Sequence, residues 1–555
     1  MDTQRLILFF IFAFSLLMLW EAWQKEMRPP QQNAAAQQAL PSPSAPAAAP
    51  VKPAGAPPPP AAQSAAPPAV PPAVPPAARR ERIRIKTDLL HAEIDTQGGD
   101  IVYLELLKHK DSNADNQNLV LLSPEHRYAA QSGLIGEGLP NHKTVYSSAS
   151  PKEVTLAPGK DSVSVRLEAP ESQGVKVAKI LTFHRGGYEI EIAQEIANGG
   201  AAVLAAHAYF QLTRDNRAPP GEVAMMPTFT VPAVYTAEDK YQKLSWEDLD
   251  KGKARYPKSP DNGWIAIVQH YFVAALLPAQ KTPREFYTRK LAENFYSVGV
   301  ILPVAPAAPG ATTTVQVSLY AGPQEQEKLK SIAAGLDLVV DYGWLTVIAA
   351  PLFWVLELFH KSTGNWGIAI ILLTVVIKLI FFPLSAASYR SMAKMKLVTP
   401  RLMKIRETYA NDRAKQNQAM MDLYKAEKIN PLGGCLPIVV QIPVFIALYW
   451  VLLAAVELRH APFYLWITDL SAQDPWYVLP ALMMVSMLVQ TKMNPTPPDP
   501  VQAKVMMIMP FAFGIMFFFF PSGLVLYWFV NNILSIAQQW QINRMIEGGK
   551  AAAKR

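Results

Sequence analysis

The carboxyl-terminal third of the chain consists mainly of long apolar runs separated by short polar loops, and this pattern limits the fold more than any other feature. About 17–25 apolar residues suffice for a helix to cross the hydrocarbon core of a bilayer. Charged residues make up only 17% of the chain, whereas soluble domains typically carry about 25%. The sequence therefore predicts a polytopic α-helical membrane protein with six transmembrane helices. One would form within residues 1–28, and the others at 365–387, 432–456, 476–492, 503–520 and 523–542.

The first apolar run, Leu6–Trp23, has two interpretations. It is long enough for an uncleaved membrane anchor, which we favour. A cleaved signal peptide is the alternative, but its apolar region would be unusually long, and no small-x-small cleavage motif follows directly. Residues 29–78 are rich in proline and alanine, so they cannot bury a core and favour extended polyproline II conformations. They predict a linker, either a tether that lets the next domain stand off the membrane or a spacer with no partner of its own.

Residues 79–323 differ from both neighbours, because apolar and polar side chains alternate between turns of glycine and proline. A period of two is typical of β-strands that bury one face. The region therefore predicts one large all-β domain, folded as a sandwich. The predicted strands include Arg82–Lys86, Ser162–Leu167, a hairpin of 175–183 and 188–196, Trp264–Leu277 and Thr314–Tyr320.

The predicted β domain lacks the short motifs that mark common catalytic and cofactor sites. It contains no H-E-x-x-H, G-x-S-x-G, P-loop or G-x-G-x-x-G sequence, and isolated histidines such as His184 and His270 are typical of structural positions. The single cysteine, Cys435, excludes an internal disulfide and a cysteine-based zinc site. We therefore expect no enzymatic activity, no cofactor and no metal.

Positive charge is concentrated between Ala387 and Pro431, where ten lysine and arginine residues outnumber four acidic ones. Short basic loops remain on the cytoplasmic side of a membrane. The tail, residues 546–555, is also basic, so we expect both termini in the cytoplasm and the β domain outside. One crossing must then separate the β domain from the basic loop. Residues 324–360 are thus predicted to form helices at the outer interface, and a true span by Tyr342–Phe359 is the alternative.

The basic loop has helical order of its own. Apolar residues recur at helical spacing on both sides of Asn411-Asp412, which predicts a hairpin of two amphipathic helices within residues 388–430. Such basic helices either are solvated near anionic lipid headgroups or contact RNA or a partner protein. The apolar positions are Val398, Leu402, Ile405, Tyr409, Met420, Leu423 and Tyr424.

Lys378 is a charged residue well inside a predicted span. It follows Trp366 by 12 residues, which is about 18 Å along a helix, and the hydrocarbon core is about 30 Å thick. A charge there costs about 2.5–3.5 kcal/mol on insertion scales, so it predicts a functional site. Thr374 lies one turn earlier on the same face and makes that face polar. The alternative is that Lys378 extends to the cytoplasmic headgroups.

Further polar side chains in the spans have two interpretations. Gln441, between Pro437 and Pro443, could share a hydrated cavity with Lys378. It could equally form an ordinary hydrogen bond between helices. The same alternatives apply to four residues of the last span, Asn531, Asn532, Gln538 and Gln539.

Several short segments together resemble the YidC/Oxa/Alb family of membrane protein insertases. The resemblance is strong over residues 340–545, and the β domain is similar to that of the Gram-negative form. The combination is specific, whereas no single motif is. The segments are Asn365–Gly367, Phe382–Leu384, Ser391–Met395, Leu423–Lys428, Asn430–Pro437, Asp469–Pro475 and Phe520–Leu524 in the helical part, and Asp95–Asp100, Gln131–Leu134 and Leu319–Pro323 before it.

The resemblance implies a five-helix insertase core within residues 361–545, built around a hydrophilic groove. In the family the groove opens to the cytoplasm and to lipid, and a positive side chain in it attracts the polar tail of an incoming protein. The implied location is the bacterial inner membrane, with the β domain in the periplasm. The implied partners are nascent integral membrane proteins, the Sec translocon, membrane lipids and, less directly, the ribosome and the signal recognition machinery. No nucleotide and no specific nucleic acid are expected.

The groove residues implied by the resemblance depart from the family at the key charge. Lys378 stands where the bacterial family has arginine, which keeps the charge but loses the bidentate fork. Trp528 stands where tyrosine is common, and it remains an amphipathic aromatic residue. The candidate substrate groove consists of Lys378, Thr374, Gln441, Ile442, Phe445, Tyr527 and Trp528.

We therefore predict an inner-membrane insertase and chaperone whose positive, half-open groove lowers the barrier for polar segments. A solute transporter that uses Lys378 as an anion or proton site is the first alternative, but the sequence shows no inverted repeat to support it. A structural envelope tether built on the anchor, the linker and the β domain is the second alternative. It leaves the polar groove without a role.

Overall fold

The computed structural model describes residues 80–111, 117–219, 229–427, 436–494 and 500–553. All of them belong to one compact unit, Pro76–Arg555. The predicted anchor, residues 1–28, and the predicted linker, residues 29–78, lie outside the described residues. The same holds for residues 428–435, which contain Cys435.

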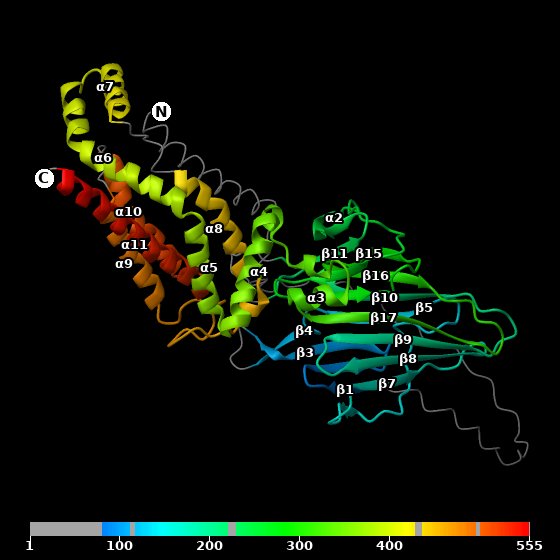
Figure 1. Cartoon of the computed structure of the whole chain (residues 1–555). Helices are drawn as coiled ribbons and strands as arrows, with labels where there is room; N and C mark the ends of the chain where they lie inside the picture. The colour runs from blue at the N-terminus through cyan, green and yellow to red at the C-terminus, as the bar shows by residue number, and fades with distance from the viewer. Residues whose placement is uncertain (1–79, 112–116, 220–228, 428–435, 495–499, 554–555) are drawn as a thin grey trace, which may run out of the picture. The chain divides into compact units, whose positions relative to one another are not determined.

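The predicted all-β region forms two sheets, which confirms the expected fold class of this part (Figure 1). Within the described residues, the nine-stranded sheet has the order β15-β16-β10-β5-β3-β2-β1-β6, with β4 also paired to β3. The eight-stranded sheet has the order β12-β11-β13-β14-β17-β9-β8-β7. The first sheet contains β1 (Arg82–Lys86), β2 (Leu90–Asp95), β3 (Asp100–Lys110), β4 (Asn118–Leu122), β5 (Ala129–Ile135), β6 (Glu153–Thr155), β10 (His207–Asp215), β15 (Glu285–Ala292) and β16 (Phe295–Pro303). The second contains β7 (Ser162–Glu168), β8 (Val175–His184), β9 (Glu189–Asn198), β11 (Val231–Thr236), β12 (Lys240–Lys243), β13 (Trp264–Val268), β14 (Phe272–Leu277) and β17 (Thr312–Pro323).

The alternation seen in the sequence accounts for these strands. In β1 the isoleucines Ile83 and Ile85 are buried while Arg82, Arg84 and Lys86, which alternate with them, are exposed, as a strand with one covered face requires. The predicted hairpin is formed by β8 and β9, which pair antiparallel along their length. A short helix, α2 (Trp246–Asp250), interrupts the strands and is capped by the side chain of Ser245.

One predicted strand was wrong in its extent. Trp264–Leu277 is not a single strand, because the chain reverses between β13 and β14. The side chain of Gln324 donates hydrogen bonds to the carbonyls of Gln269 and Phe272 at this reversal. The residue that stabilises the turn is thus more than fifty residues away in sequence. A local sequence pattern could therefore not predict this turn.

A buried lysine joins the two sheets. Lys179 on β8 is fully buried, and its ammonium donates hydrogen bonds to the carbonyls of Gly98 and Ser132. Asp100 interacts with it electrostatically. Burial lowers the pKa of Lys179 and raises the pKa of Asp100, while the attraction between the two opposes both shifts. The ammonium therefore bridges the sandwich through backbone carbonyls and a nearby carboxyl group.

We predict that Lys179→Met destabilises the β domain, because two buried carbonyls lose their donor and Asp100 loses its compensating charge. The expected loss is about 3 kcal/mol of unfolding free energy. Urea denaturation of the purified full chain, followed by tryptophan fluorescence, measures it. Lys176→Met is the matched control, since Lys176 lies on the same strand but is exposed. Equal stability of the two variants would contradict the bridging role.

The chain becomes helical after β17, and the helices follow the predicted order. Three spans predicted at 432–456, 476–492 and 503–520 correspond to α8, α9 and α10, and the last predicted span lies in the longer helix α11. The elements are α3 (Gln326–Ile332), η1 (Leu336–Val339), η2 (Gly343–Leu345), α4 (Thr346–Thr363), α5 (Trp366–Ile380), α6 (Phe382–Thr408), α7 (Arg413–Ala426), α8 (Leu436–Ala454), η3 (Val456–Leu458), α9 (Val478–Met493), α10 (Pro500–Phe517) and α11 (Ser522–Ala553).

The predicted span 365–387 is broken in the structure. The helix begins at Trp366, capped by the side chain of Asn365, and ends at Ile380. After a bend of 66°, α6 begins at Phe382. Pro383 in the first turn of α6 explains the break, because proline has no N–H for the preceding helix and disfavours helical geometry before it. The boundary between span and hairpin therefore lies nearer to Phe381 than to residue 387.

The segment Gly343–Thr363 consists of η2 and α4. Among the described residues, it is the one unbroken helical segment that is long and apolar enough to cross a membrane. The helices α5 and α6 together are also long and apolar enough to cross a membrane, as one span with a bend. The other apolar helices are shorter. Trp344, Val347 and Trp354 are exposed on this segment, so its free face is apolar. Residues 324–360 were predicted to lie at the outer interface. The length and composition of Gly343–Thr363 also permit the alternative, a span across the membrane.

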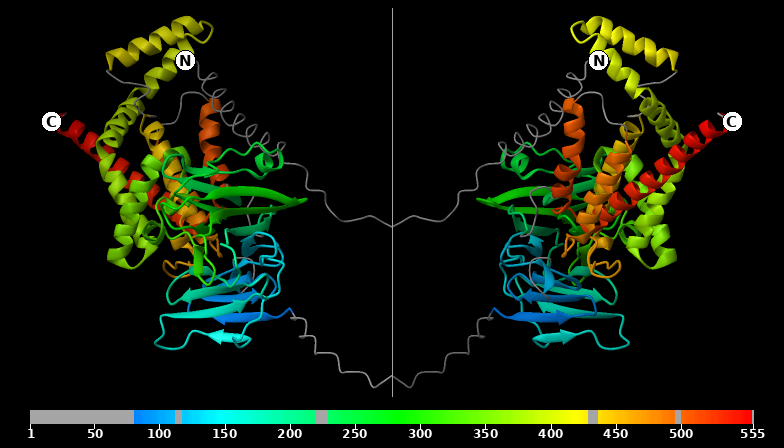
Figure 2. Two further views of the ribbon diagram at one scale, coloured as in Figure 1. Left: turned by 90° about the vertical axis from the view of Figure 1, so that its right-hand side faces the viewer. Right: turned by 90° about the vertical axis from the view of Figure 1, so that its left-hand side faces the viewer.

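The predicted helical hairpin is present in the basic loop. The helix α7 folds back beside the second half of α6, as both views show (Figure 2). Val398 and Leu402 are buried at this contact against four residues that include Met420 and Leu423. Arg401 on α6 also forms an ion pair with Glu427. The apolar spacing in the sequence therefore identified the surfaces that meet.

Candidate functional site

The helix α11 is central to the helical part of the chain. It packs against α5, α6, α8 and α9 (Figure 1). Six of the first seven residues from Ser522 to Trp528 are buried, so the start of this helix lies inside the bundle. The candidate groove residues come from α5, α8 and α11. Because α11 packs against both other helices, its position determines which of these residues can meet.

Four of the seven predicted residues meet between α8 and α11. Phe445 contacts the edge of Trp528, with ring centroids 4.4 Å apart, and it stacks on Tyr527 at 6.4 Å. The side chain of Gln441 donates a hydrogen bond of 3.4 Å to the hydroxyl of Tyr527. We call Gln441, Phe445, Tyr527 and Trp528 the aromatic wall. It combines apolar ring faces with a few polar groups, which suits contact with varied apolar side chains.

Lys378 lies near the end of α5 and is half-buried. Its ammonium donates a hydrogen bond of 2.7 Å to the hydroxyl of Ser535 on α11. Within the described part of the chain, Lys378 forms no ion pair with a carboxylate. The lysine is thus directed toward α11, and it contacts a residue that the sequence reasoning did not single out.

The remaining two predicted residues differ in their exposure. Thr374 is fully buried, and its hydroxyl donates to the carbonyl of Ile370 one turn earlier in the same helix. Its polar group is therefore satisfied locally and does not add a free hydrogen-bonding group beside Lys378. Ile442, by contrast, is 46% exposed on α8, so it is accessible to an incoming apolar segment.

Most polar residues of the last span form hydrogen bonds between elements. Asn532 donates to Ser486 on α9, and Gln538 donates to the carbonyl of Phe382. Gln539 reaches Asn494. These three residues therefore fit the alternative of ordinary interhelical partners. Asn531 differs, because its side-chain oxygen is buried without a hydrogen-bond partner among the described residues.

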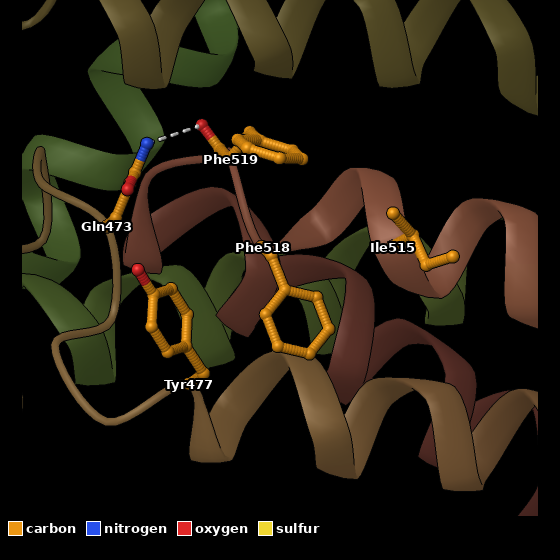
Figure 3. A pocket seen from close by; sticks show the side chains of 5 residues that line it. All are labelled: Gln473, Tyr477, Ile515, Phe518 and Phe519. Carbon is orange, nitrogen blue, oxygen red and sulfur yellow. Dashed lines mark hydrogen bonds between the residues drawn. The ribbon is translucent and has the colours of Figure 1, made fainter.

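A cavity of about 380 Å³ lies elsewhere, between the start of α9 and the end of α10 (Figure 3). It is lined by Gln473, Tyr477, Ile515, Phe518 and Phe519, and none of the candidate groove residues takes part. The amide of Gln473 points to the carbonyl of Phe519 and donates a hydrogen bond to it. No charged side chain lines the cavity, so it offers no charge that would attract an oppositely charged segment.

Sequence reasoning missed a buried carboxyl group at the end of α8. Glu457 in η3 accepts a hydrogen bond of 3.4 Å from the backbone N–H of Gln326, and its other oxygen has no partner within the described ranges. Gln326 in turn donates its side-chain amide to the hydroxyl of Tyr342. Burial raises the pKa of Glu457 to about 7, and the nearby Glu325 and Glu357 add to this shift. A glutamate at the edge of an apolar run was the only signal available.

Two family models match the chain. The model described as the YidC periplasmic domain matches residues 82–355. The model described as 60Kd inner membrane protein matches residues 358–550. The first covers the two sheets together with the helices α3 to η2 and the first part of α4. The second covers the rest of α4 and the helices that hold the candidate groove.

Curated relatives match over the whole chain. The membrane protein insertase YidC of Dechloromonas aromatica is 58% identical over 554 residues, which cover 100% of this chain and 99% of the relative. The protein of the same name from Aromatoleum aromaticum is 56% identical and covers 100% of both chains. Among solved structures, an active YidC insertase crystal structure with the first transmembrane domain resolved is 18% identical, with a TM-score of 0.38. It covers 83% of this chain and 92% of that one. The curated relatives are thus named as insertases and not as enzymes.

We predict that the stability of the full chain falls as the pH rises from about 5 to about 8, in part because of Glu457. With its pKa raised from 4.5 to about 7, the folded state holds a proton that the unfolded state releases. Stability is therefore complete below about pH 4.5 and is lost as the pH rises through about 7. The corresponding difference between the protonation states is about 3 kcal/mol.

Glu457→Gln removes this ionisation and is expected to raise the melting temperature in detergent at about pH 8, with little change at about pH 5. The exposed Glu137 provides the matched control variant, Glu137→Gln. If both variants shift the melting temperature equally at both pH values, the buried carboxyl group is not the cause.

Proposed function

The chain belongs to the YidC family of membrane protein insertases, and we propose that it inserts nascent membrane proteins into the bacterial inner membrane where α5 and α8 pack against α11. The observation that carries this proposal is the charge of Lys378 inside the helical bundle, held by the neutral hydroxyl of Ser535. A positive charge that no carboxylate neutralises remains available to attract the acidic groups of a client. The aromatic wall lies on the same helix, α11.

The physical steps follow from these groups. The polar tail of a client would be drawn toward Lys378, which lowers the cost of moving that tail into the membrane. The adjoining apolar segment would slide along the exposed Ile442 and the rings of the aromatic wall. Once helical, this segment satisfies its own backbone hydrogen bonds and remains in lipid because its apolar side chains are stable there. No nucleotide takes part in these steps.

We further propose the topology that the charge distribution favours. The basic hairpin α6–α7 and the tail would lie in the cytoplasm, the β domain in the periplasm, and the chain would cross the membrane six times. Residues 324–360 would lie at the outer interface. Beside nascent clients, the partners would be the Sec translocon, membrane lipids, the ribosome and the signal recognition machinery. A chaperone role would follow from a groove that holds unfolded apolar segments.

A photo-crosslinker at Ile442 tests the proposed groove. We expect it to capture a stalled nascent membrane protein in vesicles, because Ile442 is exposed on the helix that carries part of the aromatic wall. A crosslinker at Val485, which is exposed on α9, is the matched control and should capture far less. Absence of a crosslink at Ile442 in a folded, correctly oriented protein would favour the transporter alternative, which solute flux in purified vesicles would then examine.

The charge itself is tested by Lys378→Glu. We expect insertion of clients with acidic tails to fall about tenfold, which corresponds to about 1.4 kcal/mol, while clients with neutral tails are affected much less. Protease protection of the translocated tail in reconstituted vesicles measures both classes. Lys378→Arg keeps the charge and should preserve insertion. Equal impairment of acidic and neutral clients would argue that Lys378 acts only through the packing of α5.

A further inference from the structure

Ser535 connects α5 to α11 through a single oxygen atom. Its hydroxyl lies 2.7 Å from the ammonium of Lys378 on α5 and 2.8 Å from the carbonyl of Asn531 on its own helix. The side chain of Tyr389 on α6 also interacts with Ser535. The residue is buried. Lysine, serine and tyrosine therefore converge at the point where α5, α6 and α11 meet.

The donor and acceptor roles in this cluster follow from the chemistry of the groups. A hydroxyl has one proton to donate and two lone pairs that accept, whereas an ammonium can only donate. The carbonyl of Asn531 can only accept, so Ser535 gives its proton to that carbonyl. A lone pair of Ser535 then accepts from Lys378. The hydroxyl therefore acts as a donor within its own helix and as an acceptor toward α5.

We propose that Ser535 is a positioning residue that holds the ammonium of Lys378 at a fixed depth in the groove. This inference rests on the proposed function and assigns the part of the site that places its charge. A lysine stem is long and flexible, and without a partner it extends toward the headgroups. A hydrogen bond to Ser535 instead keeps the charge beside α11, the helix of Tyr527 and Trp528.

The neutral character of the partner is essential to this role. A carboxylate at the same place would hold the ammonium equally well, but it would cancel the positive charge that attracts a client. A serine hydroxyl positions the charge and leaves it intact. The ammonium of Lys378 has three N–H donors, and the oxygen of Ser535 accepts one of them.

The test compares variants of the purified full chain in vesicles, using one client with an acidic tail and one with a neutral tail. Ser535→Ala should lower insertion of the acidic client by about fivefold, since a hydrogen bond to a charged group is lost, and should change the neutral client by less than about twofold. Ser535→Thr keeps the hydroxyl and should restore the ratio. Ser535→Asp should abolish the preference for the acidic client, because it neutralises Lys378.

Ser486→Ala is the matched control, because Ser486 is also buried and also hydrogen-bonds α11, through Asn532, without contacting Lys378. It should leave the ratio between the two clients unchanged. A second readout is the rate at which an amine-reactive reagent from the cytoplasmic side labels Lys378, measured by mass spectrometry. Ser535→Ala should raise this rate, because the released side chain moves toward the headgroups.

Two results would overturn the inference. Ser535→Ala could leave the client ratio and the labelling rate unchanged, or it could impair both clients equally, as a purely structural residue would. If Ser535→Ala does not fold, Ser535→Thr and Ser535→Asp decide by the same ratio. Lys378→Met in the same assay separates this inference from the proposed function. An altered ratio in Lys378→Met with none in the Ser535 variants rejects the positioning role alone, whereas an unaltered ratio in Lys378→Met rejects the charge mechanism itself.

Discussion

A positive charge within an apolar helical bundle must be given a hydrogen-bonding partner, and the contacts among α5, α6 and α11 meet this requirement. Lys378 reaches α11 because α5 ends only two residues later, at Ile380. The bend at Phe381 then turns the chain by 66°, and Tyr389 on α6 comes to the same serine. A straight helix over residues 365–387 would carry Tyr389 away from the lysine that precedes it by three turns. The break caused by Pro383 is therefore part of how the charge is accommodated.

Local patterns in the sequence predicted the elements well and their ends less well. Alternation identified Arg82–Lys86 as a strand with the bounds it has in the structure, and helical spacing identified the surfaces that meet in the α6–α7 hairpin. Both signals are local, since they depend on which face of one element is covered. The reversal between β13 and β14 depends on Gln324, which is distant in sequence. Periodicity carries no information about such a partner.

The candidate site was predictable to the extent that side-chain type alone indicates function. A lysine inside an apolar run is conspicuous, and the resemblance to a known family supplied Gln441's neighbours Ile442 and Phe445 as well as the aromatic residues of α11. Thr374 was expected to make its face polar, yet its hydroxyl bonds to its own helix, an option open to any threonine in a helix. Ser535 was missed because serine is common in membrane helices. Its spacing of four residues from Asn531 was the one signal that could have found it.

Among the described residues, Lys179 and Lys378 are both directed into the interior of the protein, and their charges have opposite surroundings. Lys179 in the β domain donates to two carbonyls and has Asp100 nearby, so its charge is compensated and serves to join two sheets. Lys378 is held by a hydroxyl and, among the described residues, by no acidic group. If stability alone determined the surroundings of Lys378, a carboxylate partner or an apolar replacement would serve as well or better. A neutral partner leaves the positive charge available to a group that arrives from outside the bundle, as the proposed function requires.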